Sequence, residues 1–121
     1  MGKMEDRKMC AEFAGSKTLA VNDPANLEGE LWIIDGRGLQ SWCPHYESDP
    51  AAACSLLPKL AEALWCVKIE VDPMNIGGEL RMLGWFDLMG WIAEHLAGGD
   101  DTGRDRACRL IVQAVRASKG E

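Results

Sequence analysis

The chain lacks the features that would place it in a membrane or in an oxidising compartment. No apolar run approaches the ~18 residues that a membrane-spanning helix needs. The first ten residues, MGKMEDRKMC, carry charge but no apolar segment, so we expect no secretory signal. The five cysteines form no CxxC pair and are odd in number, which indicates reduced thiols in the cytosol.

Positive charge is also scarce. The sequence has 13 lysines and arginines against 19 aspartates and glutamates, a net charge of −6. Because nucleic-acid binders are usually basic, direct contact with nucleic acid is disfavoured. An acidic surface suits a basic partner surface, or it serves only to keep the protein in solution. The length of 121 residues, with 47% hydrophobic and 26% charged residues, predicts a single domain, 1–121, with its own core.

Motifs of known enzymes are missing. The sequence contains no GxSxG, no HExxH and no phosphate-binding loop. Side chains that could bind a metal or take part in catalysis lie close together in SWCPHYESDP, residues 41–50. Cys43 and His45 could bind zinc together with His95 or another cysteine, but a structural zinc site normally shows two closely spaced ligand pairs. As a nucleophile and its base they lack a defined geometry, because Pro44 lies between them. We therefore predict a protein that is not an enzyme and holds no metal or cofactor.

Two interpretations of residues 41–50 remain. In the favoured one, Trp42 and Tyr46 close one end of the core and Pro44 stiffens the entry to the next helix. In the alternative, Trp42, His45 and Tyr46 lie beside a helix N-terminus and receive an anion or a stacked base. The phosphate of such a ligand would contact a basic stripe on the last helix, unless that stripe is only a solvated face. The stripe consists of Arg106, Arg109 and Arg116.

The first half of the chain shows clear helix and strand signals. A short helix is expected within residues 5–17, and the apolar run at 31–34 predicts a strand that ends in the turn DGRG. Asp49 can cap a second helix, and Pro50 suits its first position. Pro58 should bend that helix, because its ring clashes with the carbonyl group four residues earlier.

The second half predicts a hairpin and a long final helix. Apolar and polar residues alternate over 66–71, which is typical of a half-buried strand, and residues 79–86 are its expected hairpin partner. Thr102 and Asp105 have the spacing of a capping box at the start of the last helix. Apolar residues then repeat at helical spacing, and the predicted buried face consists of Ala107, Leu110, Ile111, Ala114 and Val115.

An aromatic cluster occupies the segment MLGWFDLMGW, residues 82–91. Most such clusters are core. Five tryptophans is nevertheless a high number for this length, and exposed tryptophan and methionine are favoured at partner-binding surfaces. We therefore predict that Trp85, Phe86 and Trp91 anchor a protein partner, with burial in the core as the alternative.

Several of these segments together resemble a known family. They are the helix ending in AEFAG, then WCP, SDPAAACSLLPKL and the closing RACRLIVQAVRAS. The chain resembles the phage ABA-sandwich domain proteins, small proteins of tailed phages and prophages. The resemblance implies an α+β fold, with a small antiparallel sheet of three to five strands packed with about three helices. It also implies a strand before the last helix, so residues 91–97 are interpreted as a strand, with a helix over 87–97 as the alternative.

The resemblance implies a phage accessory protein and supplies no catalytic residues. By analogy with that gene class we expect a non-enzymatic binding protein in the host cytoplasm. The specific expectation is an anti-defence protein, an anti-CRISPR inhibitor that occludes a host effector or complex. The alternatives are a sponge that sequesters a nucleotide second messenger, and a structural or housekeeping phage protein. Self-association to a homo-oligomer is also compatible with the sequence.

Overall fold

The computed structural model describes residues 3–19, 32–74, 77 and 79–119 of the chain. The described helices and strands alternate irregularly, and every strand pairing is antiparallel, which confirms the α+β class. Within the described residues, the strands form two sheets of three and two strands. The elements in chain order are α1 (Lys3–Phe13), β1 (Lys17–Leu19), β2 (Trp32–Ile34), β3 (Gln40–Trp42), α2 (Pro50–Cys54), α3 (Leu57–Leu64), β4 (Ile69–Val71), β5 (Arg81–Leu83), α4 (Trp85–Ala97) and α5 (Asp101–Ser118).

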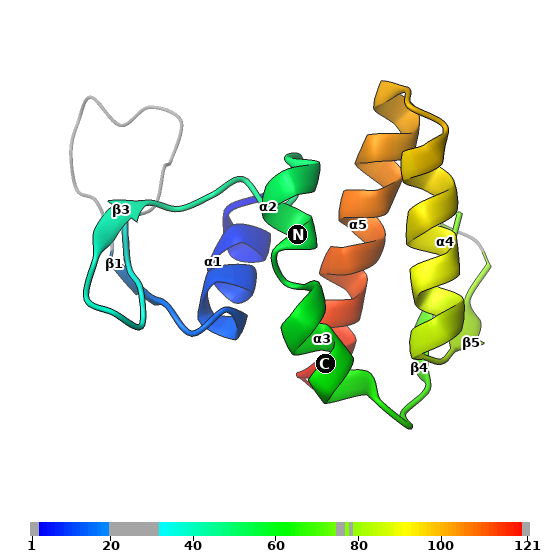
Figure 1. Cartoon of the computed structure of the whole chain (residues 1–121), viewed down its shortest axis with the longest axis horizontal. Coiled ribbons are helices and arrows are strands. Elements are labelled where there is room, and N and C mark those ends of the chain that lie inside the picture. The colour runs from blue at the N-terminus through cyan, green and yellow to red at the C-terminus, as the bar shows by residue number, and fades with distance from the viewer. Residues whose placement is uncertain (1–2, 20–31, 75–76, 78, 120–121) are drawn as a thin grey trace.

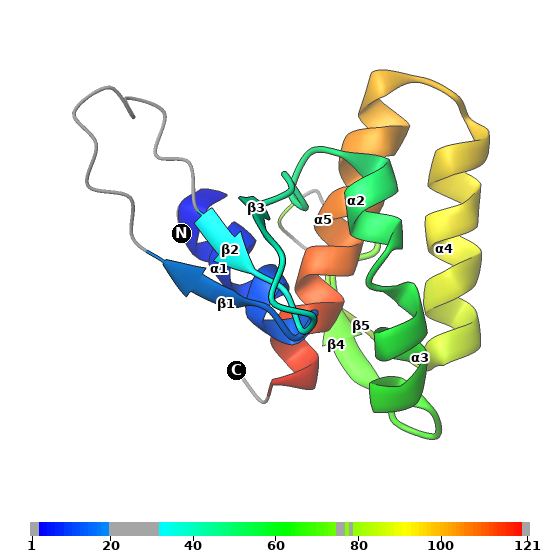
Figure 2. The same cartoon turned by 60° about the vertical axis from the view of Figure 1, so that its left-hand side comes forward.

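Helix α5 is the centre of the molecule. It contacts α1, α2, α3, α4 and β4, and Figures 1 and 2 show these elements arranged around it. All the residues of its predicted apolar face are buried, because a period of three to four residues keeps them on one side of the helix. Cys108 and Val112 are buried as well, so the apolar face is wider than the sequence pattern indicated.

The start of α5 differs from the prediction. The cap is Asp100, whose carboxylate accepts a hydrogen bond from the backbone N–H of Gly103 at 2.7 Å. Thr102 is exposed within the first helical turn, so the proposed Thr102–Asp105 capping box is wrong. At Gly103, α5 approaches α4 closely, because a Cβ atom there would lie 2.3 Å from the carbonyl oxygen of His95.

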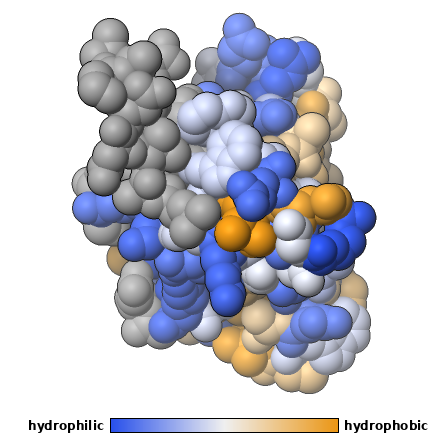
Figure 3. Space-filling model, turned by 90° about the vertical axis from the view of Figure 1, so that its left-hand side faces the viewer, coloured by the Kyte–Doolittle hydropathy of each residue, from blue (hydrophilic) through white to orange (hydrophobic). Residues whose placement is uncertain are grey.

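The three-stranded sheet, in the order β1-β2-β3, lies at one end of the molecule beside α1 (Figure 1). The predicted strand at 31–34 is confirmed for Trp32–Ile34, and its first residue lies outside the described part. The turn that follows is held by Asp35, whose carboxylate accepts hydrogen bonds from the backbone N–H groups of Arg37 and Leu39. On the face that carries this sheet, a small hydrophobic area lies among hydrophilic residues (Figure 3).

The second helical region begins as predicted. The Asp49 side chain accepts a hydrogen bond from the backbone N–H of Ala51, and Pro50 occupies the first helical position. Pro58 divides the region into α2 and α3, because a proline breaks the hydrogen-bond ladder of a continuous helix.

The predicted hairpin is confirmed with shorter strands, Ile69–Val71 and Arg81–Leu83, whereas the strand predicted at 91–97 is wrong. Ile69 pairs with Leu83 and Val71 with Arg81. Residues 91–97 instead lie in α4, which runs from Trp85 to Ala97. Leu88 and Ile92 are buried one helical turn apart, and this spacing matches a helix and not a strand. Gly90 has open space around its Cα, so it lowers helix propensity without leaving a gap in the core.

Candidate functional site

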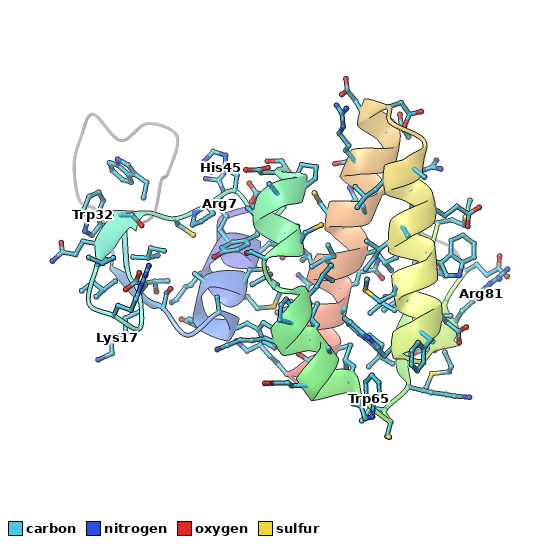
Figure 4. All side chains as sticks on the ribbon, viewed as in Figure 1. Arg7, Lys17, Trp32, His45, Trp65 and Arg81 are labelled. Atoms are coloured by element: carbon cyan, nitrogen blue, oxygen red, sulfur yellow. The ribbon has the colours of Figure 1, made fainter. Side chains whose placement is uncertain are left out.

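An apolar groove opens between the end of α3 and the start of α4. Its volume is about 450 Å³. Figure 4 shows Trp65 just beyond the end of α3, on the side where α4 begins. The lining residues are Trp65, Cys66, Val67, Lys68, Gly84, Trp85, Phe86 and Asp87. We call this surface the Trp65–Phe86 groove.

Pairing of β4 with β5 brings the two halves of the groove together. Trp65 ends α3, and Cys66 follows with a φ of 69°, a left-handed conformation that turns the chain into β4. On the partner strand, Gly84 follows β5 directly and is the N-cap residue of α4. The two turns become neighbours because Ile69 pairs with Leu83. Residues far apart in the sequence therefore share one surface.

Two large aromatic side chains of the groove face solvent. Phe86 is 76% exposed and Trp65 is 57% exposed. Their ring centroids lie 5.5 Å apart at an interplanar angle of 61°, an edge-to-face contact. Leu88 and Ile92 already supply the buried face of α4, so Phe86 is not needed to attach this helix to the core. The pair is an exposed apolar surface of the kind that protein partners cover.

The structure separates the three predicted anchors. Phe86 is exposed in the groove, and Trp85 is half-buried in its wall. Trp91 lies outside the groove: the Arg81 guanidinium is 6.0 Å from its ring centroid, and the His95 ring packs beside it. Sequence reasoning missed Trp65. The available signal was its position one residue beyond Leu64, which places it off the apolar stripe of α3.

Residues 43–49 form the predicted pinned loop between β3 and α2, with one difference from the prediction at Trp42. Tyr46 and Cys43 are buried in the core. The Cys43 thiol donates to the backbone carbonyl groups of Pro44, at 3.4 Å, and of Arg7, at 3.8 Å. Trp42, by contrast, is exposed and contacts the Trp32 ring edge-to-face, with centroids 5.0 Å apart. Trp42 therefore does not close the core.

A buried ion pair holds the same loop. The guanidinium of Arg7, on α1, donates to the carboxylate of Glu47 at 2.7 Å, and both side chains are about nine-tenths buried. This contact joins the N-terminal helix to the loop that leads into α2. The side chains of residues 41–50 that drew attention in the sequence are therefore explained by the contacts that hold this loop in place.

Burial disfavours ionisation of two thiols of the core, those of Cys10 and Cys108. It raises the pKa of Cys10 to about 12 and that of Cys108 to about 11. Thiols with such pKa values stay protonated near neutral pH and do not act as nucleophiles. Burial also raises the pKa of Tyr46 to about 12, and its ring offers no free face for a stacked base.

The arginine stripe of α5 is not uniform. Arg109 is exposed and forms an ion pair with Asp105 one turn earlier. Arg116 is half-buried and donates to the carboxylate of Asp6 on α1 at 2.5 Å. Arg106 is half-buried. The charge of Arg116 is therefore used within the fold, so the prediction of a solvated face is wrong for this position.

The contrast between half-buried Arg116 and exposed Arg109 yields a prediction for two matched substitutions. Arg116→Gln should lower the free energy of unfolding by about 1–3 kcal/mol, because it leaves the partly buried Asp6 carboxylate without its cation. Burial already raises the pKa of Asp6 against the attraction of Arg116, and removing the arginine should raise it further. The stability that Arg116→Gln loses should therefore reach its full value at a pH above the pKa of Asp6 in the variant. The loss should shrink as the pH falls below that pKa, because a protonated Asp6 has no charge to pair.

Arg109→Gln is the control, and its effect should stay within about 0.5 kcal/mol because the Arg109–Asp105 pair is exposed. Urea unfolding of both variants between neutral and acidic pH provides the measurement. Equal losses in the two variants would contradict the structural role of Arg116.

Comparison of the chain with models of protein families, with curated proteins and with solved structures finds no match. Within the described residues no helix is long and apolar enough to cross a membrane. In the same residues no three His, Cys, Asp or Glu side chains are grouped so that they could hold a metal ion. Because the comparisons find no match, the resemblance to phage ABA-sandwich proteins stays a prediction. The candidate site is the Trp65–Phe86 groove, which the geometry of the described residues identifies.

Proposed function

We propose that this chain is a non-enzymatic binding protein that covers the surface of a protein partner with the Trp65–Phe86 groove. The observation that carries the proposal is the edge-to-face pair of Phe86 and Trp65, both more than half exposed beside an apolar cavity. Aromatic side chains are enriched at the centre of protein interfaces, where a few anchor residues dominate the binding free energy.

The groove has the composition of an interface centre. Apolar side chains line most of it, and the charged residues Lys68 and Asp87 also contribute to its wall. Apolar contacts surrounded by charged groups give a partner both affinity and orientation. The net charge of −6 favours encounter with a basic partner surface.

The specific form of the proposal is a phage-encoded anti-defence protein in the host cytoplasm. Its target would be a CRISPR effector, whose basic nucleic-acid channel offers the complementary charge, and its mechanism would be occlusion. Expression in cells with active CRISPR interference should restore the survival of a targeted plasmid. Unchanged interference would remove this target and leave the groove to another partner.

Replacing Phe86 tests the groove itself. Phe86→Ala should weaken partner binding by about 2 kcal/mol, or roughly 30-fold, because it removes an interfacial anchor. The melting temperature should stay nearly unchanged, since the ring is largely outside the core. Leu39→Ala is the matched control, because Leu39 is 57% exposed in the turn between β2 and β3. Unfolding of Phe86→Ala at ambient temperature would show that the ring is core, and would contradict the proposal.

A further inference from the structure

The Trp65–Phe86 groove continues along the outward side of α4. The exposed residues on this side recur every three or four positions, as on one face of a helix, and are Phe86, Gly90, Ala93 and Ala97. We call this surface the outer face of α4. The buried residues Leu88 and Ile92 lie on the opposite side of the helix. Figures 1 and 2 place α4 at the border of the molecule, with α5 on its inner side.

The outer face of α4 has the length and width of one helix. From Phe86 to Ala97 it extends for about three helical turns, or about 16 Å. After the Phe86 ring its side chains are small, and a Cβ atom at Gly90 would meet no other atom within 4 Å. Small side chains let a second helix lie close against the first, with its own larger side chains filling the space. An amphipathic helix covers such a surface with apolar residues three and four positions apart.

The charges beside the outer face of α4 select a basic helix. Helix α4 contains no lysine or arginine. Asp87 and Glu94 are exposed, lie seven residues apart on the same flank, and form no ion pair within the described residues. Lysines or arginines seven residues apart on a partner helix match this spacing. An acidic helix in the same position would meet repulsion from both carboxylates.

Lys68 sets the direction of that helix. It is exposed and lines the groove where α4 begins. The N-cap residue of α4 is Gly84, which has no side chain to cap the first N–H groups, so this end of α4 keeps its partial positive charge. The C-terminal end of a helix carries partial negative charge and fits beside both groups. A helix that binds here therefore runs antiparallel to α4.

We propose that the Trp65–Phe86 groove and the outer face of α4 together bind a basic amphipathic helix of the partner protein, antiparallel to α4. The apolar side of that helix covers Phe86 and packs against Gly90. Its lysines or arginines pair with Asp87 and Glu94. This inference rests on the proposed function and names the element of the partner that the groove binds.

Two synthetic peptides test the charge of the bound helix. Both carry leucines every three or four positions on an alanine background. The basic peptide has lysines seven residues apart on each flank of the leucines, and the acidic peptide has glutamates at the same positions. Fluorescence anisotropy of the labelled peptides measures their binding. The basic peptide should bind the wild-type protein about ten-fold more tightly, because ion pairs with Asp87 and Glu94 replace like-charge contacts.

Charge reversal on α4 tests where the peptide binds. Asp87→Lys combined with Glu94→Lys should reverse the order of the two affinities. Glu5→Lys combined with Glu12→Lys is the matched control and should preserve the order. These two exposed residues of α1 have the same spacing, and their replacement changes the net charge by the same amount.

Gly90→Gln tests the contact surface independently of charge. The variant should lose the binding of the basic peptide, because a long side chain at this position holds a second helix away from α4. Its melting temperature should not fall, since the space around Gly90 is open and glutamine has the higher helix propensity. A melting temperature equal to that of the wild type verifies that each charge variant also folds.

Four outcomes would overturn the inference: no binding of the basic peptide at any soluble concentration, equal affinities for the two peptides, an α1 control that reverses the order as the α4 variant does, and unchanged binding by Gly90→Gln. A dimer in light scattering that Gly90→Gln dissociates would assign the outer face of α4 to a second copy, and would overturn it too. Phe86→Ala separates this inference from the proposed function. If Phe86→Ala loses the partner from lysate while the Gly90 and α4 charge variants retain it, the groove stands and the basic helix is wrong. If Phe86→Ala keeps the partner, the proposed function itself fails.

Discussion

Replacing Arg7 with methionine should lower the free energy of unfolding by about 3–5 kcal/mol. The guanidinium of Arg7 lies 2.7 Å from the carboxylate of Glu47, and both side chains are about nine-tenths buried. Methionine fills similar space but leaves the Glu47 charge buried without a cation. The second carboxylate oxygen of Glu47 is buried and has no hydrogen-bond partner, so the carboxylate relies on the contact with Arg7 at its first oxygen. Urea unfolding at neutral pH measures the loss.

A double-mutant cycle separates the ion pair from simple packing. Arg7→Met combined with Glu47→Leu should be more stable than Arg7→Met alone, because the double variant buries no unpaired charge. Arg37→Met serves as the control for removing an arginine from an exposed pair, and its effect should stay within about 0.5 kcal/mol. If Arg7→Met is as mild as Arg37→Met, the loop at residues 41–50 is not held by this contact.

Leu110→Ala should lower the free energy of unfolding by about 2–5 kcal/mol. Leu110 is fully buried on α5, the helix that α1, α2, α3 and α4 all contact. The substitution removes apolar contacts and leaves a cavity that rigid neighbouring helices fill only in part. Thermal and urea unfolding measure the effect. Leu39→Ala removes the same atoms from an exposed position, so its effect should stay within about 0.5 kcal/mol. A loss as small as that of Leu39→Ala would mean that α5 is not the centre of the core.

Local patterns predicted the elements whose signals lie within a few residues of one another. The apolar face of α5, the cap at Asp49 and the β4–β5 hairpin all follow from such patterns. At Pro58 the pattern predicted a bend within one helix, whereas the structure has two separate helices, α2 and α3. The strand expected at 91–97 failed because a family resemblance outweighed the spacing of Leu88 and Ile92. Their helical repeat continues through the segment and decides its structure.

The candidate site depended on contacts that no local pattern contains. Sequence reasoning selected Phe86 but could not tell which of the adjacent rings Trp85 and Phe86 faces the core. Trp65 joins Phe86 only because β4 pairs with β5. In the same way, Arg116 forms an ion pair with Asp6, near the other end of the chain, and so does not act as part of the basic stripe. Such pairings depend on the packing of α1 and α5, which the spacing of residues within either helix does not specify.

The most direct test of the central claim compares three proteins in quantitative affinity capture from host lysate: wild type, Phe86→Ala and Leu39→Ala. We expect wild type and Leu39→Ala to retain the same partner, and Phe86→Ala to lose most of it, at equal melting temperatures for all three. Mass spectrometry of the retained proteins measures the difference. Equal retention of the same proteins by wild type and Phe86→Ala would contradict the claim that the Trp65–Phe86 groove is the binding surface.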